Sequence, residues 1–155
     1  MNLRIPVAMQ KGEAAAQAPA EHTAMPHRIL IIEDGRVLAK NMKTYLSRAS
    51  CEVRTATDAA QAFEMLNSFA PDVLILDYGL PDVDGLRTYA EIVRRQARKI
   101  EGVMITGDSS AQLAQDAHAL GIHHVICKPF RISDLARLLE TPAASAAGDT
   151  PERNN

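Results

Sequence analysis

The sequence has few cysteines and little net charge, and both shortages limit what the protein can be. Only Cys51 and Cys127 occur among 155 residues. Two cysteines are too few for a disulfide framework, so we expect free thiols and a reducing, cytoplasmic compartment. Seventeen basic residues nearly balance nineteen acidic ones, giving a formal net charge of −2 at pH 7. This balance argues against broad electrostatic binding to nucleic acid or anionic lipid, which needs an excess of positive charge.

Long apolar segments are missing as well. No hydrophobic run approaches the roughly 20 residues that a membrane-spanning helix needs. Residues 1–17 contain no continuous apolar stretch of the kind found in a signal peptide. No internal repeat is visible, so a solenoid is not expected. The composition, with 46% hydrophobic and 23% charged residues, fits a soluble globular protein of one domain.

The two ends of the chain differ from its middle. Residues 1–26 are rich in Ala, Gln, Glu and Pro, and residues 141–155 have a similar composition. Neither end shows a sustained strand or helix period, so we expect a disordered extension and a disordered tail around a domain at residues 27–140. The tail is too short to form a DNA-binding or catalytic module, so we expect no effector domain after it.

Between these ends, short apolar runs alternate with segments of helical periodicity. The expected strands are residues 28–33, 52–56, 72–77, 102–106 and 123–127. The expected helices are residues 36–48, 59–69, 84–98, 109–120 and 132–140. Strands separated by helices must be parallel, with helices on both faces of the sheet. We therefore predict an α/β fold: a doubly wound, flavodoxin-like (βα)5 domain whose parallel sheet has the order 2-1-3-4-5.

Polar residues at the helix boundaries fit this division. Asp58 and Ser133 are expected as N-caps, and Gly121 as the residue that ends a helix. Asp82 and Asp84 follow the third strand, and we interpret them as loop and N-cap residues rather than metal ligands.

Reactive side chains follow four of the expected strands. Glu33 and Asp34 come at the end of the first strand and Asp77 at the end of the third, while Thr106 ends the fourth and Lys128 follows the fifth. The carboxyl ends of parallel strands meet at one edge of the sheet, where ligands bind. Three carboxylates together repel one another unless a cation joins them, and oxygen ligands suit Mg²⁺.

These residue types are those that phosphoryl transfer needs. A carboxylate can attack phosphorus and form an acyl phosphate. A divalent cation and an ammonium group can neutralise the charge on the transferring group, and a hydroxyl can hydrogen-bond one of its oxygens.

The same positions resemble the receiver domain of response regulators in bacterial two-component signalling. The resemblance covers about residues 27–140. It is carried by Glu33-Asp34, by the segment 77-DYGLPDVDG-85, by Thr106-Gly107 and by Lys128-Pro129-Phe130. It implies that Asp77 is the phosphoacceptor. It also implies that Mg²⁺ is bound by Asp77, by Asp34, by Glu33 directly or through water, and by the backbone carbonyl of Gly79.

The resemblance implies further roles for Thr106 and Lys128, which would contact the phosphoryl group, and a cis peptide before Pro129. Two positions depart from the family pattern. Val125 stands where the family commonly has Tyr or Phe, so the usual coupling of that ring to Thr106 on activation is in doubt. Gly107 stands where Ala is common.

The expected function is therefore that of a receiver, with a sensor histidine kinase or histidine phosphotransfer protein as phosphodonor and a downstream protein as partner. The partner surface, and the face of any homodimer, is expected on residues 109–120, 123–127 and 132–140. One alternative is a receiver-like scaffold that works without phosphorylation, which Val125 keeps open. The other is a Mg²⁺-dependent phosphohydrolase similar to the haloacid dehalogenases, but these need an acid where this chain has Gly79.

Overall fold

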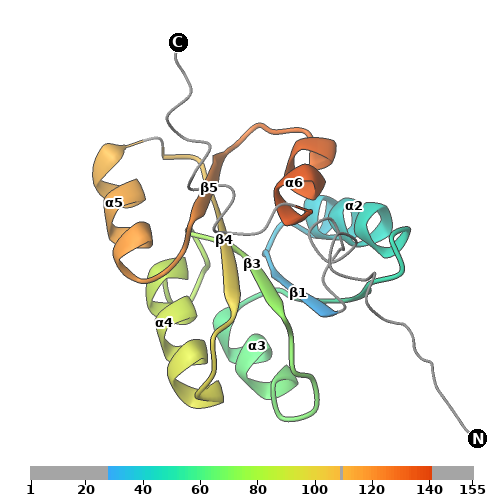
Figure 1. Cartoon of the computed structure of the whole chain (residues 1–155), viewed down its shortest axis with the longest axis horizontal. Coiled ribbons are helices and arrows are strands. Elements are labelled where there is room, and N and C mark those ends of the chain that lie inside the picture. Colours follow the sequence, from blue (N-terminus) through green and yellow to red (C-terminus); the bar gives the residue numbers. More distant parts are fainter. Residues whose placement is uncertain (1–27, 109, 141–155) are drawn as a thin grey trace, which may run out of the picture.

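The computed structural model describes residues 28–108 and 110–140, which form one layer of strands between two layers of helices (Figure 1). The strands are β1 (Arg28–Ile32), β2 (Glu52–Ala56), β3 (Val73–Asp77), β4 (Glu101–Thr106) and β5 (His124–Cys127). The helices are α2 (Arg36–Ser47), α3 (Ala59–Met65), α4 (Gly85–Gln96), α5 (Ala111–Ala119) and α6 (Ile132–Leu139). The terminal segments that we expect to be disordered lie outside the described residues.

The five strands form a parallel sheet in the order β2-β1-β3-β4-β5, which confirms the predicted fold class. The chain runs outward from β1 to β2, then crosses back to β3 and continues through β4 to β5. The strand order therefore reverses between β1 and β3, and ligands of doubly wound sheets bind at this reversal.

Alternate residues of each central strand are buried on opposite faces of the sheet. On β1, Ile29 and Ile31 pack with α2 and α6, whereas Leu30 and Ile32 pack with α3, α4 and α5. Strand β3 divides in the same way and is buried along its whole length. Burial on both faces is why these strands are continuous apolar runs rather than alternating ones.

The helix ends agree with most of the expected caps. The Asp58 side chain accepts a hydrogen bond from the backbone N–H of Gln61, and Gly121 has the positive φ of 99° that ends α5. The prediction for Ser133 was wrong. Helix α6 begins at Ile132, so Ser133 lies within its first turn, and the N-cap is Arg131, which makes no side-chain cap.

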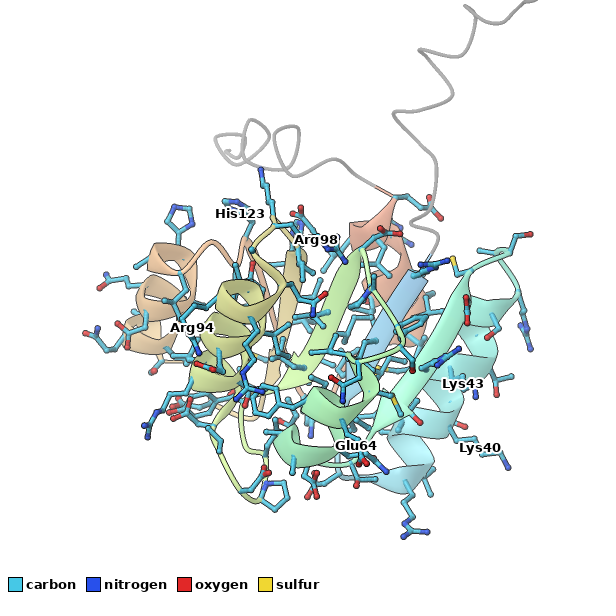
Figure 2. All side chains as sticks on the ribbon, turned by 90° about the horizontal axis from the view of Figure 1, so that it is seen from below. Lys40, Lys43, Glu64, Arg94, Arg98 and His123 are labelled. Carbon is cyan, nitrogen blue, oxygen red and sulfur yellow. The ribbon has the colours of Figure 1, made fainter. Side chains whose placement is uncertain are left out.

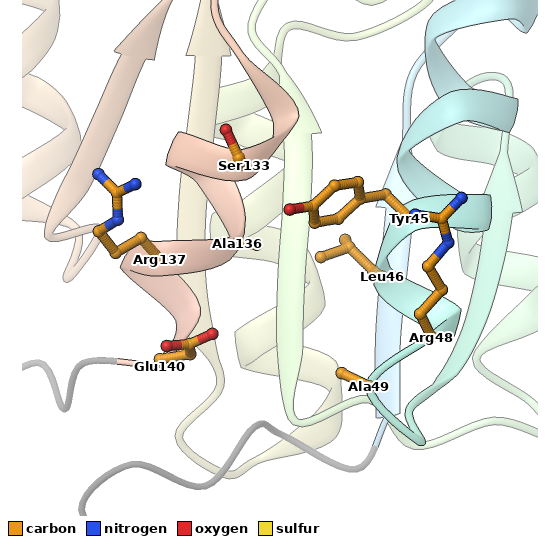
Figure 3. Close-up of a pocket in the computed structure, with 8 residues that line it drawn as sticks. All are labelled: Tyr45, Leu46, Arg48, Ala49, Ser133, Ala136, Arg137 and Glu140. Atoms are coloured by element: carbon orange, nitrogen blue, oxygen red, sulfur yellow. The ribbon is translucent and has the colours of Figure 1, made fainter.

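Helices α2 and α6 lie side by side on one face of the sheet and leave a groove between them (Figure 3). Tyr45 and Leu46 line it from α2, and Ala136 lines it from α6 together with Glu140, the residue after that helix. None of the helices in residues 28–108 and 110–140 is long and apolar enough to cross a membrane.

Candidate functional site

Three carboxylates come together at the carboxyl edge of the sheet. Oxygen atoms of Glu33, Asp34 and Asp77 all lie within 4.8 Å of one another. The β1–β3 register explains part of this: Ile32 pairs with Leu76, so Glu33 and Asp77 are the next residues along two adjacent strands. Glu33 and Asp77 are 2% and 5% exposed, whereas Asp34 is exposed.

Lys128 faces this acidic pocket from the other side. Its Nζ atom lies 3.2 Å from Asp77 Oδ2 and 3.5 Å from Glu33 Oε1. The backbone N–H of Lys128 donates to the carbonyl of Thr106 at 2.8 Å, which continues the pairing of β5 with β4. The Lys128–Pro129 peptide is cis, as predicted.

Burial and neighbouring charges shift the pKa values of two residues in the pocket, Glu33 and Lys128. Burial raises the pKa of Glu33, and the charge of Asp77 raises it further, against the opposing effects of the Gly35 N–H and Lys128. Burial lowers the pKa of Lys128, but the charges of Glu33 and Asp77 outweigh this effect and raise it overall. Lys128 is therefore an ammonium at neutral pH.

The donor set fits a hard divalent cation. All three side chains offer oxygen atoms, which Mg²⁺ prefers. Glu33 Oε2 accepts a hydrogen bond from the N–H of Gly35 at 2.9 Å, but Glu33 Oε1 is buried without a hydrogen-bond partner. Its nearest cation is Lys128 Nζ at 3.5 Å, so this oxygen has an ion pair but no hydrogen bond and keeps lone pairs for a metal ion.

The expected switch residues are Thr106, at the end of β4, and Val125, within β5. Thr106 is 1% exposed, and its Oγ1 accepts a hydrogen bond from the N–H of Asp108 at 2.8 Å. Val125 pairs with Met104 in the sheet and packs, partly buried, against the core beneath α3, α4 and α5. Val125 therefore fills a packing position on β5, two strands away from Asp77 on β3.

The segment after Asp77 is a tight loop whose two ends are hydrogen-bonded to the end of β3 and the residue after it. The N–H of Gly79 donates to Asp77 Oδ1 at 3.1 Å, and the N–H of Gly85 donates to the Tyr78 carbonyl at 2.8 Å. Asp84 caps α4, since its side chain accepts from the N–H of Arg87 at 2.9 Å, as expected.

Sequence reasoning missed what Asp82 does. It is a loop residue, as expected, but its carboxylate accepts hydrogen bonds from the N–H groups of Ala59 and Ala60, at the start of α3. Ala59 and Ala60 lie 23 and 22 positions before Asp82 in the chain, and no local sequence pattern links them to the loop.

A second group of charged side chains lines a separate hollow. It contains Arg94, Arg98 and His123, which lie well away from Lys40 of α2 in Figure 2. Arg94 pairs with Glu91 at 2.5 Å, and Arg98 donates to the carbonyl of Pro71. They take no part in the acidic pocket.

Comparison with known proteins agrees with this geometry. A family model described as the response regulator receiver domain matches residues 29–140. The transcriptional regulatory protein KdpE of Staphylococcus aureus is 35% identical over 124 residues, which cover 78% of this chain and 53% of KdpE. PhoP of Escherichia coli is 32% identical over 111 residues, covering 70% of this chain and 48% of PhoP. The chain thus spans about half the length of these relatives.

A solved structure shows the same fold. The chemotaxis response regulator CheY4 of Vibrio cholerae superposes with a TM-score of 0.67 at 24% identity, over 73% of this chain and 95% of that one. The family model covers most of the chain, and the strand order and the strand-end residues agree with it. The chain therefore belongs to the response regulator receiver domain family.

Proposed function

We propose that the protein is a cytoplasmic phosphoacceptor of a two-component system or phosphorelay. Asp77 takes a phosphoryl group from a histidine kinase or a histidine phosphotransfer protein. One observation carries the proposal: the buried Asp77 carboxylate lies 3.2 Å from the Lys128 ammonium and beside the carboxylates of Glu33 and Asp34. A nucleophile, a cation site and a fixed positive charge thus occupy one pocket.

In the proposed reaction, a carboxylate oxygen of Asp77 attacks phosphorus and forms the O–P bond of an acyl phosphate. The bond between phosphorus and the imidazole nitrogen of the donor breaks; its electron pair stays on that nitrogen, which takes up a proton from water. Glu33, Asp34, Asp77 and the Gly79 carbonyl would hold Mg²⁺, which supplies positive charge to the transferring group. Lys128 then contacts the phosphoryl oxygens and neutralises charge on them.

Thr106 links this chemistry to the partner surface. Its oxygen already accepts a hydrogen bond from Asp108, so its hydroxyl hydrogen can be donated to a phosphoryl oxygen. Movement of Thr106 toward the phosphoryl group would pull on the loop that leads into α5. A downstream protein, or a second copy of the chain, would read the change on the face formed by α5, β5 and α6. Val125 offers no ring to turn inward, so the loop carries the signal.

Two other functions are less well supported. A phosphohydrolase of the haloacid dehalogenase type needs an acid two residues after its nucleophile, and Gly79 has no side chain to supply one. A scaffold that is never phosphorylated would draw support from Val125, but it would leave the ion pairs of Lys128 with Glu33 and Asp77 without a purpose.

The proposal is tested by incubating the protein with acetyl phosphate, with Mg²⁺ or with EDTA, and measuring the intact mass. We expect one added phosphoryl group per chain with Mg²⁺ and none with EDTA. Sustained release of phosphate from a small phosphate ester would instead indicate a phosphohydrolase. The scaffold alternative would gain support from partner binding that beryllofluoride, a mimic of the acyl phosphate, does not change.

A further inference from the structure

The loop between β3 and α4 is tied to helix α3 by one side chain. Asp82 Oδ1 accepts a hydrogen bond from the N–H of Ala59 at 3.1 Å, and Asp82 Oδ2 accepts one from the N–H of Ala60 at 3.0 Å. Oδ1 also accepts from the N–H of Val83 at 2.9 Å. A carboxylate that accepts from several backbone N–H groups makes charge-assisted hydrogen bonds, which are stronger than neutral ones.

Helix α3 is therefore capped by two carboxylates from different parts of the chain. Its first N–H groups lack partners within the helix. Asp82 satisfies those of Ala59 and Ala60, while Asp58, the residue just before the helix, satisfies that of Gln61 at 2.8 Å. Both acids cap the same helix, but only Asp82 belongs to the loop that follows Asp77.

The rest of the loop has no comparable tie. Among the residues that the structure describes, the other hydrogen bonds of residues 79–84 stay within the segment from Asp77 to Thr88. Leu80 adds apolar packing against the core. The end of the loop is held by the hydrogen bond from the Gly85 N–H to the Tyr78 carbonyl. Its middle is held by Asp82, which bonds it to helix α3.

We propose that Asp82 is a positioning residue: its hydrogen bonds to Ala59 and Ala60 hold the β3–α4 loop, and with it Gly79, in place next to Asp77. The inference rests on the proposed function, in which the Gly79 carbonyl is a Mg²⁺ ligand. Gly79 is two residues from Asp77 and three from Asp82, so the tie acts close to the ligand. Gly79 has no side chain that could anchor it to another element, so its position depends on the residues around it.

The direction of the Asp82 pKa supports strong bonds at this position. Burial acts to raise the pKa of Asp82, but the hydrogen bonds from the N–H groups of Ala59, Ala60 and Val83 outweigh it and lower the pKa overall. Asp82 is therefore ionised at neutral pH and keeps both oxygens available as acceptors.

The test compares Asp82→Ala with Asp58→Ala, because each removes one carboxylate cap from α3 and only the first releases the loop. Calorimetric titration with Mg²⁺ should give a dissociation constant raised about tenfold in Asp82→Ala, a loss typical of removing a group that orients a metal ligand. Asp58→Ala should bind Mg²⁺ as the wild type does, despite a comparable loss of thermal stability. Asp82→Asn keeps one acceptor oxygen and should fall between the two.

A second readout does not depend on Mg²⁺. Hydrogen exchange without metal should speed up at residues 79–84 in Asp82→Ala and stay unchanged there in Asp58→Ala. The inference is overturned if the two variants match in Mg²⁺ affinity and in loop exchange, because Asp82 would then be only a helix cap. A wild-type protein that binds no Mg²⁺ would contradict the proposed function instead, and loop exchange would still decide whether Asp82 holds the loop.

Discussion

The ammonium group of Lys128 and the carboxylate of Asp77 face each other at 3.2 Å, although β4 lies between the strands that carry them. Lys128 lies next to Thr106 of β4, whose carbonyl accepts a hydrogen bond from the Lys128 N–H. This arrangement places a positive charge against Asp77 before any ligand arrives, and it gives Lys128 two roles. It balances the charge of the pocket in the resting protein, and it stabilises the charge that develops on a phosphoryl group.

Replacing Lys128 with Met should impair both roles. We expect phosphorylation by acetyl phosphate to slow about 100-fold, since removing one group that stabilises transition-state charge has an effect of this size. The free energy of unfolding should fall by only about 1 kcal/mol, because the Lys128 side chain is 34% exposed and solvent weakens its ion pairs. Single-turnover labelling and urea denaturation measure the two effects.

Lys40→Met is the matched control for this variant. Lys40 is exposed on α2 and makes no ion pair within the described residues. Its replacement should leave both the labelling rate and the stability near the wild-type values. A Lys128→Met protein labelled at the wild-type rate would show that Lys128 has no part in the transfer.

Gly85 allows the loop after Asp77 to close against its own strand. A Cβ atom at this position would lie 2.6 Å from the Asp77 carbonyl oxygen and 2.8 Å from the Tyr78 Cα atom. Both atoms belong to the backbone and cannot turn away. We expect Gly85→Ala to lower the free energy of unfolding by about 1–3 kcal/mol, and to slow phosphorylation by displacing the loop.

Gly107 offers the matched control, because a Cβ atom there would meet nothing within 4 Å. Gly107→Ala should be neutral or should stabilise the protein by up to about 1 kcal/mol, since alanine restricts the unfolded chain. Urea midpoints for both variants check the pair. Equal effects of the two substitutions would mean that the close approach at Gly85 does not hold in solution.

His124 should make the stability depend on pH. It is 9% exposed. Burial lowers its pKa, and His123 adds to this effect while Glu101 opposes it. The unfolded chain therefore takes up a proton more readily than the folded one. Stability should be full above about pH 6.5, the ordinary pKa of histidine, and should fall as the pH drops below that value.

Urea denaturation between pH 5 and 8 measures this dependence, with His124→Gln as the test variant. The His124→Gln profile should be flatter than that of the wild type below pH 6.5. His118→Gln is the control, since His118 is exposed on α5, and it should keep the wild-type slope. If His124→Gln keeps the wild-type dependence of stability on pH, another titratable group causes that dependence.

The sequence was enough to predict that the strand-end carboxylates meet, because parallel strands end at one edge of the sheet. Once 28–33 and 72–77 are recognised as strands, Glu33 and Asp77 must lie together, and the register of β1 with β3 places them so. Burial on both sheet faces also follows from the unbroken apolar runs. These predictions depend only on local periodicity and on topology.

Other features depend on contacts between distant segments, which local patterns do not encode. Asp82 looks like an ordinary loop acid, and only the folded chain brings it to the start of α3. Ser133 has the residue type of an N-cap, but α6 begins one residue before it. Helix α4 ends at Gln96, two residues before the predicted end, because Ala97 adopts a left-handed conformation with φ of 54°.

The central claim is that Asp77 carries the phosphoryl group, and locating that group on the chain tests it most directly. The wild type, Asp77→Asn and Asp84→Asn should be treated with acetyl phosphate and Mg²⁺, reduced with borohydride, and mapped by peptide mass spectrometry. Borohydride converts an aspartyl phosphate to homoserine, which marks the position. The account predicts homoserine at residue 77 in the wild type and in Asp84→Asn, and none in Asp77→Asn. Modification of Asp77→Asn to the wild-type extent, or homoserine at another position in the wild type, would contradict it.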